Sequence, residues 1–448
     1  MTRTVHFSGA FMQSFTSVGP MLDVAALFSA IAVYSGRYLG IVMLAAFGIT
    51  FTTIYVVSSL ASRYENNGGY FFFAGKVHGK FSGVSVAVIY LLYSVLVIPN
   101  ISIFVSFFSL AFIDMPVSTI PYWLYLFPIV FILIITGIIS FGLTHSIRYT
   151  VAAGTVELLF MVVLNFLFLI HTHGHVIIAV PSSMGDLGSV FTGVIFGVLA
   201  FAGSGSSIFI SENTVNGHRT VPKGISFAFV VTGIILVSTA FIMFSFLGPT
   251  GFSTYTENPS YVGSAIHVAF GSVVYYAYGA VAILSAINLS VAYGNALFSA
   301  VRKMIADHIV PLSQYSKTTK TLSFIALEIA IAEISVVFLG SLYAFLLLAG
   351  IVSLAYMVVH VIAASTLIRL KSGKKEITKL ILAAVSATVL IITFSFSIFY
   401  DLTGGFIDTL TATAFLVIVF ISFATVLLLR NNRTNWYRKI TFDENSTT

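Results

Sequence analysis

The chain has 448 residues, of which 58% are hydrophobic and only 8% are charged. Soluble domains carry about 25% charged residues, so this composition indicates an integral membrane protein. The formal net charge of +6 does not indicate a nucleic-acid partner, because the basic residues lie between the apolar runs. The absence of cysteine excludes disulfides and thiolate metal sites. We therefore predict no nucleic acid, no metal site and no cofactor.

Apolar runs of about 20 residues are typical of helices that span a membrane. We predict an all-α integral membrane protein with twelve transmembrane helices. The runs lie at 7–34, 39–62, 83–112, 121–141, 148–171, 189–211, 223–247, 271–301, 322–340, 342–368, 378–400 and 408–429.

The basic residues predict the orientation of these helices, because Lys and Arg collect in cytoplasmic segments. With twelve helices and both termini inside, 20 of the 21 basic residues face the cytoplasm, and only Arg37 lies outside. The inner residues are Arg3, Arg63, Lys76, Lys80, Arg148, Arg219, Lys223, Arg302, Lys303, Lys317, Lys320, Arg369, Lys371, Lys374, Lys375, Lys379, Arg430, Arg433, Arg438 and Lys439. We predict a multi-pass protein of the plasma membrane with cytoplasmic termini.

Two of the predicted helices contain small residues that interrupt them. In the sixth helix the sequence from Gly203 to Ser207 reads GSGSS, and in the first helix Ser14 to Pro20 reads SFTSVGP. Proline fits the start of a second half-helix, since its missing N–H needs no partner there. Corresponding breaks in two halves of a chain indicate a transporter site built from inverted repeats. The alternative is that both are packing motifs, in which small residues let helices approach.

Two acidic residues lie within predicted spans, where charge is costly and usually faces a cavity or a partner. Asp23 follows the first break and could meet a substrate ammonium, a cation or a proton, or be hydrated in an outer vestibule. Glu157 lies nine residues after Arg148, about 13.5 Å along a helix and deep in the bilayer. We favour a role for Glu157 in coupling; the alternative is a glutamate that is hydrogen-bonded to a neighbouring helix.

Three loop segments resemble signatures of the amino acid–polyamine–organocation (APC) permeases. Leu60 to Tyr64 and Gly68 to Tyr70 resemble the family's ELASRYPxAGGxYxY, although Ser59 replaces its acid and Glu65 its proline. Glu212 and the sequence from Arg219 to Ile225 resemble EExKNPRRTIPRAI. The sequence from Met304 to Pro311 resembles MARDGxLP, with His308 at the glycine.

The resemblance extends to the second break, where the sequence from Phe201 to Gly203 takes the place of the family's FxGFE. Ser204 and Gly205 stand where the family usually has an aromatic residue and an acid. This departure predicts a roomier, uncharged pocket wall and leaves the substrate range open.

Membership of this family implies a LeuT-like fold, with helices one to five and six to ten as inverted repeats and two appended helices. It also implies amino acid or amine transport by alternating access, in which backbone groups at both breaks bind the substrate. The substrate-binding residues would be Thr16, Ser17, Val18 and Gly19 with Phe201, Ala202, Gly203, Ser204 and Gly205.

The resemblance also suggests how transport is coupled to an ion. A lysine is common in the family near the position of Glu157, and a glutamate there could carry the proton or help to ligate sodium. In sodium-coupled relatives, small hydroxyl residues of the eighth helix face helix one. Ser285 and Asn288 are the candidates, since they lie three apart on one helical face. The alternative is an ordinary hydrogen bond to a backbone carbonyl.

We therefore predict a secondary active transporter, not an enzyme, that imports an amino acid together with a proton. A polyamine or organocation carrier and an amino acid exchanger are alternatives, and a channel or an intramembrane enzyme is a more distant one. We predict one transmembrane domain over 1–430, with repeats at 7–171 and 189–368, helices eleven and twelve at 378–429, and a cytoplasmic tail at 431–448. The partners are a small amino acid or amine and the lipid bilayer; the sequence does not indicate an oligomeric state.

Overall fold

The computed structural model describes residues 3–113, 115–258, 260–310, 316–370, 377–431 and 435–442. Within these ranges all regular secondary structure is helical, apart from one isolated bridge between Val5 and Thr214. Some basic residues used to predict the orientation, Lys371, Lys374, Lys375 and Arg433, lie outside the described residues, as do Pro311 and the end of the predicted tail.

The first part of the chain forms a helical run of unequal pieces, because glycines interrupt it. Its elements are α1 (Phe7–Thr16), α2 (Pro20–Leu22), the π-helical turn η1 (Asp23–Leu27), α3 (Phe28–Ser35), the short turn η2 (Gly36–Tyr38) and α4 (Leu39–Arg63). Gly19 has φ +70° and Gly36 has φ +51°, a region that only glycine adopts readily. The chain therefore leaves helical geometry before α2 and again after α3.

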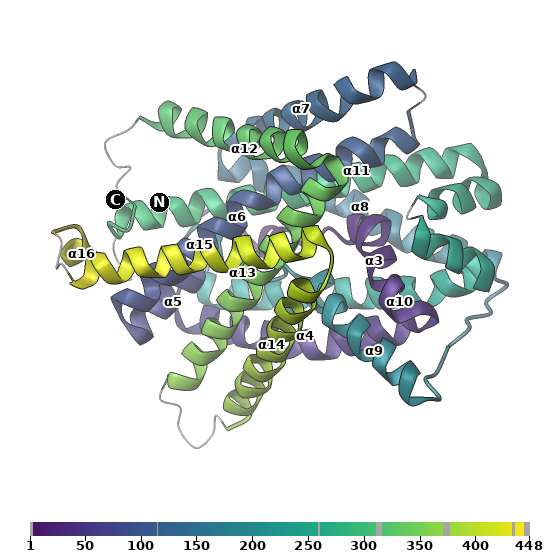
Figure 1. The fold of residues 1–448 in the computed structure, drawn as a ribbon. Coiled ribbons are helices and arrows are strands. Elements are labelled where there is room, and N and C mark those ends of the chain that lie inside the picture. The colour runs from purple at the N-terminus through teal and green to yellow at the C-terminus, as the bar shows by residue number, and fades with distance from the viewer. Residues whose placement is uncertain are drawn as a thin grey trace.

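The remaining elements follow in chain order (Figure 1). They are α5 (Gly69–His78), α6 (Lys80–Phe108), η3 (Ser109–Ala111), η4 (Val117–Thr119), α7 (Ile120–Ser140), α8 (Leu143–His171), α9 (Met184–Gly197), η5 (Val198–Phe201), η6 (Ser206–Asn213), α10 (Gly217–Glu257), α11 (Tyr261–Ala306), α12 (Lys317–Leu339), α13 (Ser341–Arg369), α14 (Ile377–Thr403), α15 (Phe406–Asn431) and α16 (Asn435–Lys439).

Eleven helical runs of the described chain are long and apolar enough to cross a membrane, where we predicted twelve. The difference arises at the start, because one run, Phe7–Arg63, contains the first two predicted spans. This run has 57 residues, and a bilayer core of about 30 Å needs only about 20 helical residues.

Two helices are longer than the sequence predicted, and one was not predicted. The helix α10 continues past Gly248 and α11 begins before Gly271, and both glycines have positive φ inside the helical run. The predicted spans end at 247 and begin at 271, so the sequence marked both bends; it did not show that helical structure continues beyond them. The unpredicted helix is α5, which is short and largely buried and begins at Gly69, the second glycine of the Gly68-Gly69 pair.

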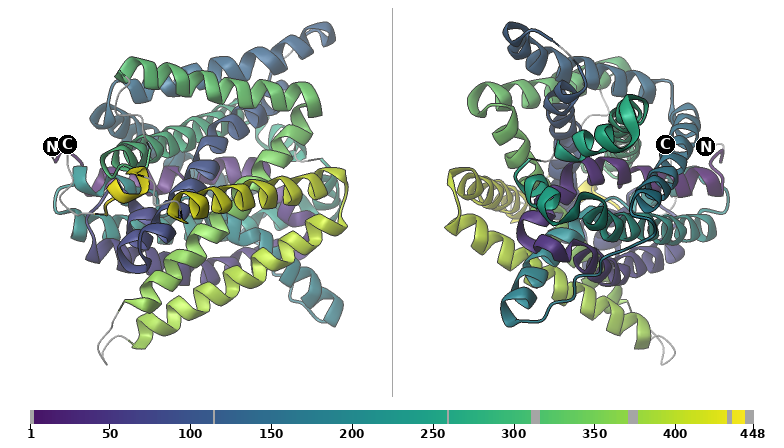
Figure 2. Two further views of the ribbon diagram at one scale, coloured as in Figure 1. Left: turned by 60° about the vertical axis from the view of Figure 1, so that its left-hand side comes forward. Right: turned by 90° about the vertical axis from the view of Figure 1, so that its right-hand side faces the viewer.

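The core lies where the interrupted helices are enclosed by longer ones. The helix α1 packs against α8, α10, α11 and η6, while α4 packs along α10 and α6 packs along α13. The helices α7 and α12 lie side by side at one edge of the bundle (Figure 1), and α14 packs against α15. The turned views keep α14 and α15 adjacent on the outside of the bundle (Figure 2).

Both ends of the described chain contact the connection between α4 and α6. Arg3 forms an ion pair with Glu65, and Lys80 Nζ donates to the Arg438 carbonyl oxygen at 3.0 Å. We call this face of the bundle the terminal side; it comprises residues 3–5, 64–80 and 435–442. The two ends of the described chain therefore lie on the same face of the bundle.

The last described residues are packed into the terminal side rather than extended from it. Ile440 is fully buried and Phe442 is 8% exposed. A Cβ at Gly75 would lie 2.5 Å from the Phe442 ring, and a Cβ at Gly83 would also collide with it. The Thr441 N–H donates to the Asp307 carbonyl oxygen at 3.2 Å. Two glycines of α5 and α6 thus make room for a phenylalanine of the tail.

Candidate functional site

The first break is a left-handed turn between α1 and α2. The α1 helix ends at Thr16, Gly19 has φ +70° and ψ +58°, and Pro20 begins α2. Val18 and its neighbours are buried, and a Cβ at Gly19 would lie 2.8 Å from Leu289 of α11. Glycine is therefore required both by the backbone and by the close approach of α11.

The second break lies between η5 and η6. Phe201 ends η5, Ala202 is extended, Gly203 has φ +94°, and η6 begins at Ser206. Ser204 Oγ turns back to the Phe201 carbonyl oxygen at 2.9 Å. Most of these residues are fully or nearly fully buried, so their freed backbone groups need partners within the protein.

The two breaks contact each other directly. Ser17 Oγ donates to the Gly203 carbonyl oxygen at 2.7 Å and lies 2.7 Å from Ser206 Oγ. Ser206 Oγ in turn donates to the Gln13 carbonyl oxygen at 2.9 Å. A Cβ at Gly203 would collide with the Ser17 carbonyl group. The structure thus brings the predicted substrate-binding segments 16–19 and 201–205 together.

A polar seam that the sequence did not reveal continues from the breaks to α8 and α11. Gln13 is fully buried, and its Nε2 donates to the Ala292 carbonyl oxygen at 2.7 Å. Asn295 Nδ2 lies 3.4 Å from Gln13 Oε1, and Ser146 Oγ donates to Asn295 Oδ1 at 2.6 Å. The one signal in the sequence that could have indicated this seam is Gln13, a polar residue just before the first break.

The Glu157 carboxylate lies beside the first break and is fully buried. It accepts hydrogen bonds from Ser285 Oγ at 2.6 Å and Asn288 Nδ2 at 2.9 Å, and the Met21 backbone N–H donates to it at 3.3 Å. The Leu22 N–H donates to Ser285 Oγ at 3.1 Å. Three of the residues that we proposed for ion coupling therefore meet at the start of α2.

Asp23 lies in the same turn of the chain but is not hydrogen-bonded to that cluster. Its residue is partly exposed, while its Oδ2 atom is buried and has no hydrogen-bond partner among the described residues. Asn288 Oδ1 is likewise buried without a partner in the described part of the chain. Both oxygens could accept a proton donor or a cation.

The Glu157 cluster caps a helix that runs away from the break. The first N–H groups of a helix have no partner within it and carry partial positive charge. Met21 and Leu22 supply two such groups at the start of the helical segment from Pro20 to Ser35. Glu157 satisfies one and Ser285 the other, so the carboxylate lies where the half-helix favours negative charge.

An aromatic cluster faces the second break from α5, α6, α11 and α13. Tyr70 Oη lies 2.9 Å from His360 Nε2, and His360 Nδ1 lies 2.9 Å from the Tyr356 carbonyl oxygen. Because a carbonyl oxygen only accepts, Nδ1 carries the proton and Nε2 accepts from Tyr70. Tyr93 packs edge-on against both Tyr293 and Tyr356.

These tyrosines fill the space left by the missing side chains of Gly203 and Gly205 in the second break. A Cβ at Gly205 would lie 2.8 Å from Tyr70 Oη and 3.1 Å from Val57, and one at Gly203 would lie 3.1 Å from Tyr293 Oη. The sequence predicted a roomier wall here. Instead, aromatic side chains from other helices fill it, which no local pattern indicates.

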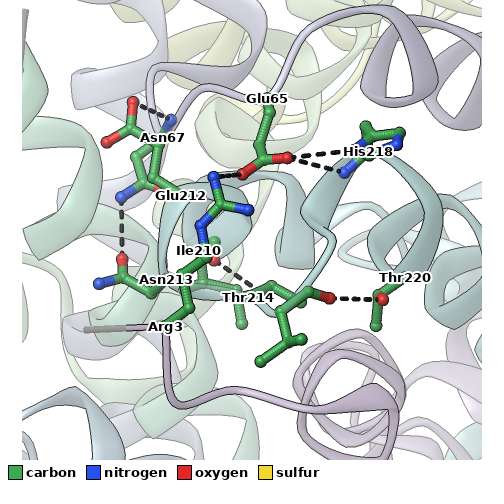
Figure 3. A network of polar contacts seen from close by, with 10 residues as sticks. Arg3, Glu65, Asn67, Ile210, Glu212, Asn213, Thr214, His218 and Thr220 are labelled. Atoms are coloured by element: carbon green, nitrogen blue, oxygen red, sulfur yellow. Dashed lines mark hydrogen bonds and ion pairs between the residues drawn. The ribbon is translucent and has the colours of Figure 1, made fainter. Parts of the chain in front are cut away.

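On the terminal side a network of polar contacts joins the start of the chain to the end of η6 (Figure 3). Glu65 pairs with Arg3 at 2.5 Å and with His218 Nδ1 at 3.4 Å. Asn67 and Glu212 form two reciprocal hydrogen bonds. The Asn67 backbone N–H donates to Glu212 Oε1 at 3.2 Å, and the Glu212 backbone N–H donates to Asn67 Oδ1 at 2.9 Å. Glu65, which replaces the family's proline, is thus the centre of this contact.

The segment after α11 fits the signature that it resembles. His308, which stands at the family's glycine, has φ +59°, a conformation that glycine adopts at little cost. Asp307 is fully buried and pairs with Lys303 at 3.1 Å.

The described chain is therefore a multi-span helical membrane protein with two interrupted helices in contact at its centre. A family model described as "Amino acid permease" matches residues 6–442, and the chain belongs to that family, within the APC superfamily. A comparison with curated proteins finds no match. The family and the helical architecture together make the protein a membrane transporter, as the signatures predicted.

Proposed function

We propose that the protein imports an amino acid across the plasma membrane by alternating access and couples this import to proton entry. The observation that carries the proposal is the Glu157 cluster, in which one buried carboxylate joins α8, α11 and the start of α2. A buried acid in a membrane protein generally marks a proton or ion pathway.

The proposal includes twelve crossings arranged as a LeuT-like 5+5 inverted repeat, with cytoplasmic termini. At 1.5 Å per residue, the 57-residue first run is about 85 Å long, far more than one bilayer. A turn at Gly36, where the backbone is non-helical, divides it into two crossings. Twelve crossings also restore the segregation of basic residues to one side.

The two breaks supply the substrate site. The amino acid's ammonium group would meet carbonyl groups freed at Ser17 and Gly203, and its carboxylate would meet N–H groups near Gly19. In this structure Ser17 Oγ bonds the Gly203 carbonyl, so substrate entry must exchange that bond for a bond to the ammonium. Because that hydrogen bond joins the two breaks, its loss on substrate binding would change the distance between α1 and η6.

Protonation of Glu157 provides a route from ion to substrate. The ionised carboxylate accepts from the Met21 N–H, whereas a protonated carboxyl carries no charge and holds that N–H less strongly. The start of α2, directly after the first break, is then released from α8. A proton bound at Glu157 would in this way change the geometry of the substrate site.

The terminal side is closed in the described conformation, and its opening would release substrate to the cytoplasm. Arg3 and His218 hold Glu65, and the Val5–Thr214 bridge ties the start of α1 to the end of η6. Separating these contacts would open a path from the breaks to the terminal side.

Two alternatives each have one supporting observation. The unpartnered Asn288 Oδ1 could ligate sodium, since hard cations prefer oxygen ligands. The unpartnered Asp23 Oδ2 could pair with an organic cation, which would favour a polyamine or other organocation substrate.

The test uses purified protein in liposomes with a panel of labelled amino acids, under a proton gradient and separately under a sodium gradient. We expect accumulation that needs the proton gradient alone and that Glu157→Gln abolishes, while exchange persists. Accumulation that needs sodium would contradict proton coupling and favour Asn288. No accumulation of any amino acid, together with uptake of labelled putrescine, would favour the organocation carrier.

A further inference from the structure

A large groove between α6, α11 and α12 lies apart from the breaks and from the Glu157 cluster. It encloses about 1120 Å³. Its walls are mainly apolar, with Leu91 and Leu96 from α6, Phe298 from α11, and Leu327 and Ile331 from α12. Leu327 is 48% exposed, so the groove opens sideways, toward the lipid rather than toward the centre of the protein.

One end of the groove is basic. Arg302 near the end of α11 and Lys320 in the first turns of α12 both line it. Arg302 is exposed and Lys320 is partly buried, and neither forms an ion pair with any residue that the structure describes. The hydroxyl-bearing side chains of Thr319 and Ser323 lie at the same end. This end therefore offers two positive charges and hydrogen-bond donors beside an apolar channel.

The length of the groove matches one leaflet of a bilayer. Along α12, Lys320 and Ile331 are separated by a rise of about 16 Å. Half of the hydrocarbon core of a bilayer is about 15 Å. With the basic end at the helix termini, which lie at the membrane surface, the apolar part covers the depth of a single leaflet.

We propose that this groove is a binding site for an anionic phospholipid. The phosphate-bearing headgroup lies between Arg302 and Lys320, and an acyl chain follows the apolar wall toward Ile331. Basic pockets between transmembrane helices bind anionic headgroups in this manner. A free amino acid is a poorer fit, because its ammonium group would face either the two cations or the apolar wall formed by Leu91, Leu96 and Phe298.

The charge of the groove selects among lipids. A zwitterionic lipid could fill the apolar wall equally well but gains less from two unpaired cations. Each basic residue near an anionic membrane surface contributes about 1 kcal/mol, or about fivefold in affinity. The two together predict about 25-fold tighter binding of an anionic than of a zwitterionic lipid with the same chains.

The experiment titrates the detergent-purified full chain with phosphatidylglycerol and, separately, with phosphatidylcholine of identical acyl chains, and measures bound lipid by native mass spectrometry. We expect Arg302→Gln/Lys320→Gln to weaken phosphatidylglycerol binding about 25-fold and to leave phosphatidylcholine binding unchanged. The matched control is Arg219→Gln/Lys223→Gln, which removes two exposed charges of the same sign outside the groove.

A second variant tests the apolar part without changing charge. Ile331→Trp fills the inner end of the groove, and we expect it to reduce the amount of bound phosphatidylglycerol while the protein still elutes as the folded species. The proposal is overturned if both lipids bind equally to the native chain. It is also overturned if the control double variant loses as much binding as the groove variant, or if Ile331→Trp retains full binding.

Discussion

Two glutamates of this protein lie fully buried within helices, but their surroundings differ. Glu157 of α8 accepts three hydrogen bonds from two other elements, α11 and α2. Glu328 of α12 has no hydrogen-bond partner for either carboxylate oxygen among the described residues. It shares a buried helical face with Ala332 and Val336, where α12 packs against α6, α7 and α13.

The difference shows that two acids buried within helices can have quite different surroundings, which separates them as candidates for the proposed coupling. Both acids would be selected by the rule that intramembrane charges are functional. Only Glu157 is surrounded by groups that stabilise its ionised form and that belong to helices on both sides of a break. A group that must gain and lose a proton needs such partners, whereas neither Glu328 oxygen has one among the described residues.

The largest expected effect is loss of coupling in Glu157→Gln. The amide keeps the size of the side chain but cannot carry a proton, so gradient-driven accumulation in liposomes should disappear while exchange of labelled for unlabelled amino acid continues. Glu328→Gln is the matched control and should accumulate substrate normally. Equal loss in both variants would remove the distinction between the two acids.

A change in the second break tests whether Glu157 acts through the breaks. Gly203→Ala places a methyl group against the Ser17 carbonyl at a positive φ that costs about 1–2 kcal/mol in an L-residue. We expect uptake to be abolished although Glu157 is unchanged.

The control for this change is Gly205→Ala, whose methyl group would meet the Tyr70 hydroxyl and the Val57 side chain and which should retain part of the uptake. Measurement of substrate affinity by isothermal calorimetry separates loss of binding from loss of movement; unchanged affinity in Gly203→Ala would place the substrate elsewhere.

Ser285→Ala should have an intermediate effect. It removes one donor to Glu157 and the acceptor of the Leu22 N–H, and each lost buried hydrogen bond costs about 1 kcal/mol. Two lost bonds amount to about 2 kcal/mol, so we expect the initial rate of proton-driven uptake to fall about 30-fold. Ser290→Ala is the control, since Ser290 lies on the same helix and its hydroxyl is buried without a partner in the described chain. A similar loss in both would argue for a general packing effect.

The smallest expected effect is that of Glu328→Leu. Replacing an unpartnered buried carboxyl by an apolar side chain should leave uptake unchanged and stabilise the protein by about 1 kcal/mol or more. The corresponding Glu157→Leu leaves three donors without an acceptor and should destabilise it by about 3 kcal/mol. Thermal unfolding in detergent measures both. Destabilisation of similar size in the two variants would mean that Glu328 has partners of its own.

The sequence predicted the parts of the site that depend on position along one helix. Ser285 and Asn288 were identified from the family resemblance, and their spacing placed them on one helical face; Glu157 was identified from its distance along the helix after Arg148. The two interruptions were visible because glycine, serine and proline stand out in an apolar run. All of these are local signals, and the geometry places the residues concerned close together.

The sequence could not predict contacts between distant segments. Gln13 meets Ala292 and Asn295, and Tyr70 meets His360, across hundreds of positions with no periodic signal. Asp23 was grouped with Glu157 because it also lies in a span, but the structure shows no hydrogen bond between Asp23 and the cluster. The bends at Gly248 and Gly271 coincide with the predicted ends of two spans, but the helical segments beyond them, to Glu257 and from Tyr261, were predicted as loop.

The packing of Phe442 against Gly75 and Gly83 has a consequence for the biosynthesis of the protein. The α5–α6 surface is made early by the ribosome, but the ring that fills its hollow is made only after all the membrane-spanning segments. Until then the hollow at Gly75 and Gly83 lacks the ring that fills it in the folded protein. Docking of the tail onto α5 and α6 therefore cannot precede synthesis of the last membrane-spanning segment, α15.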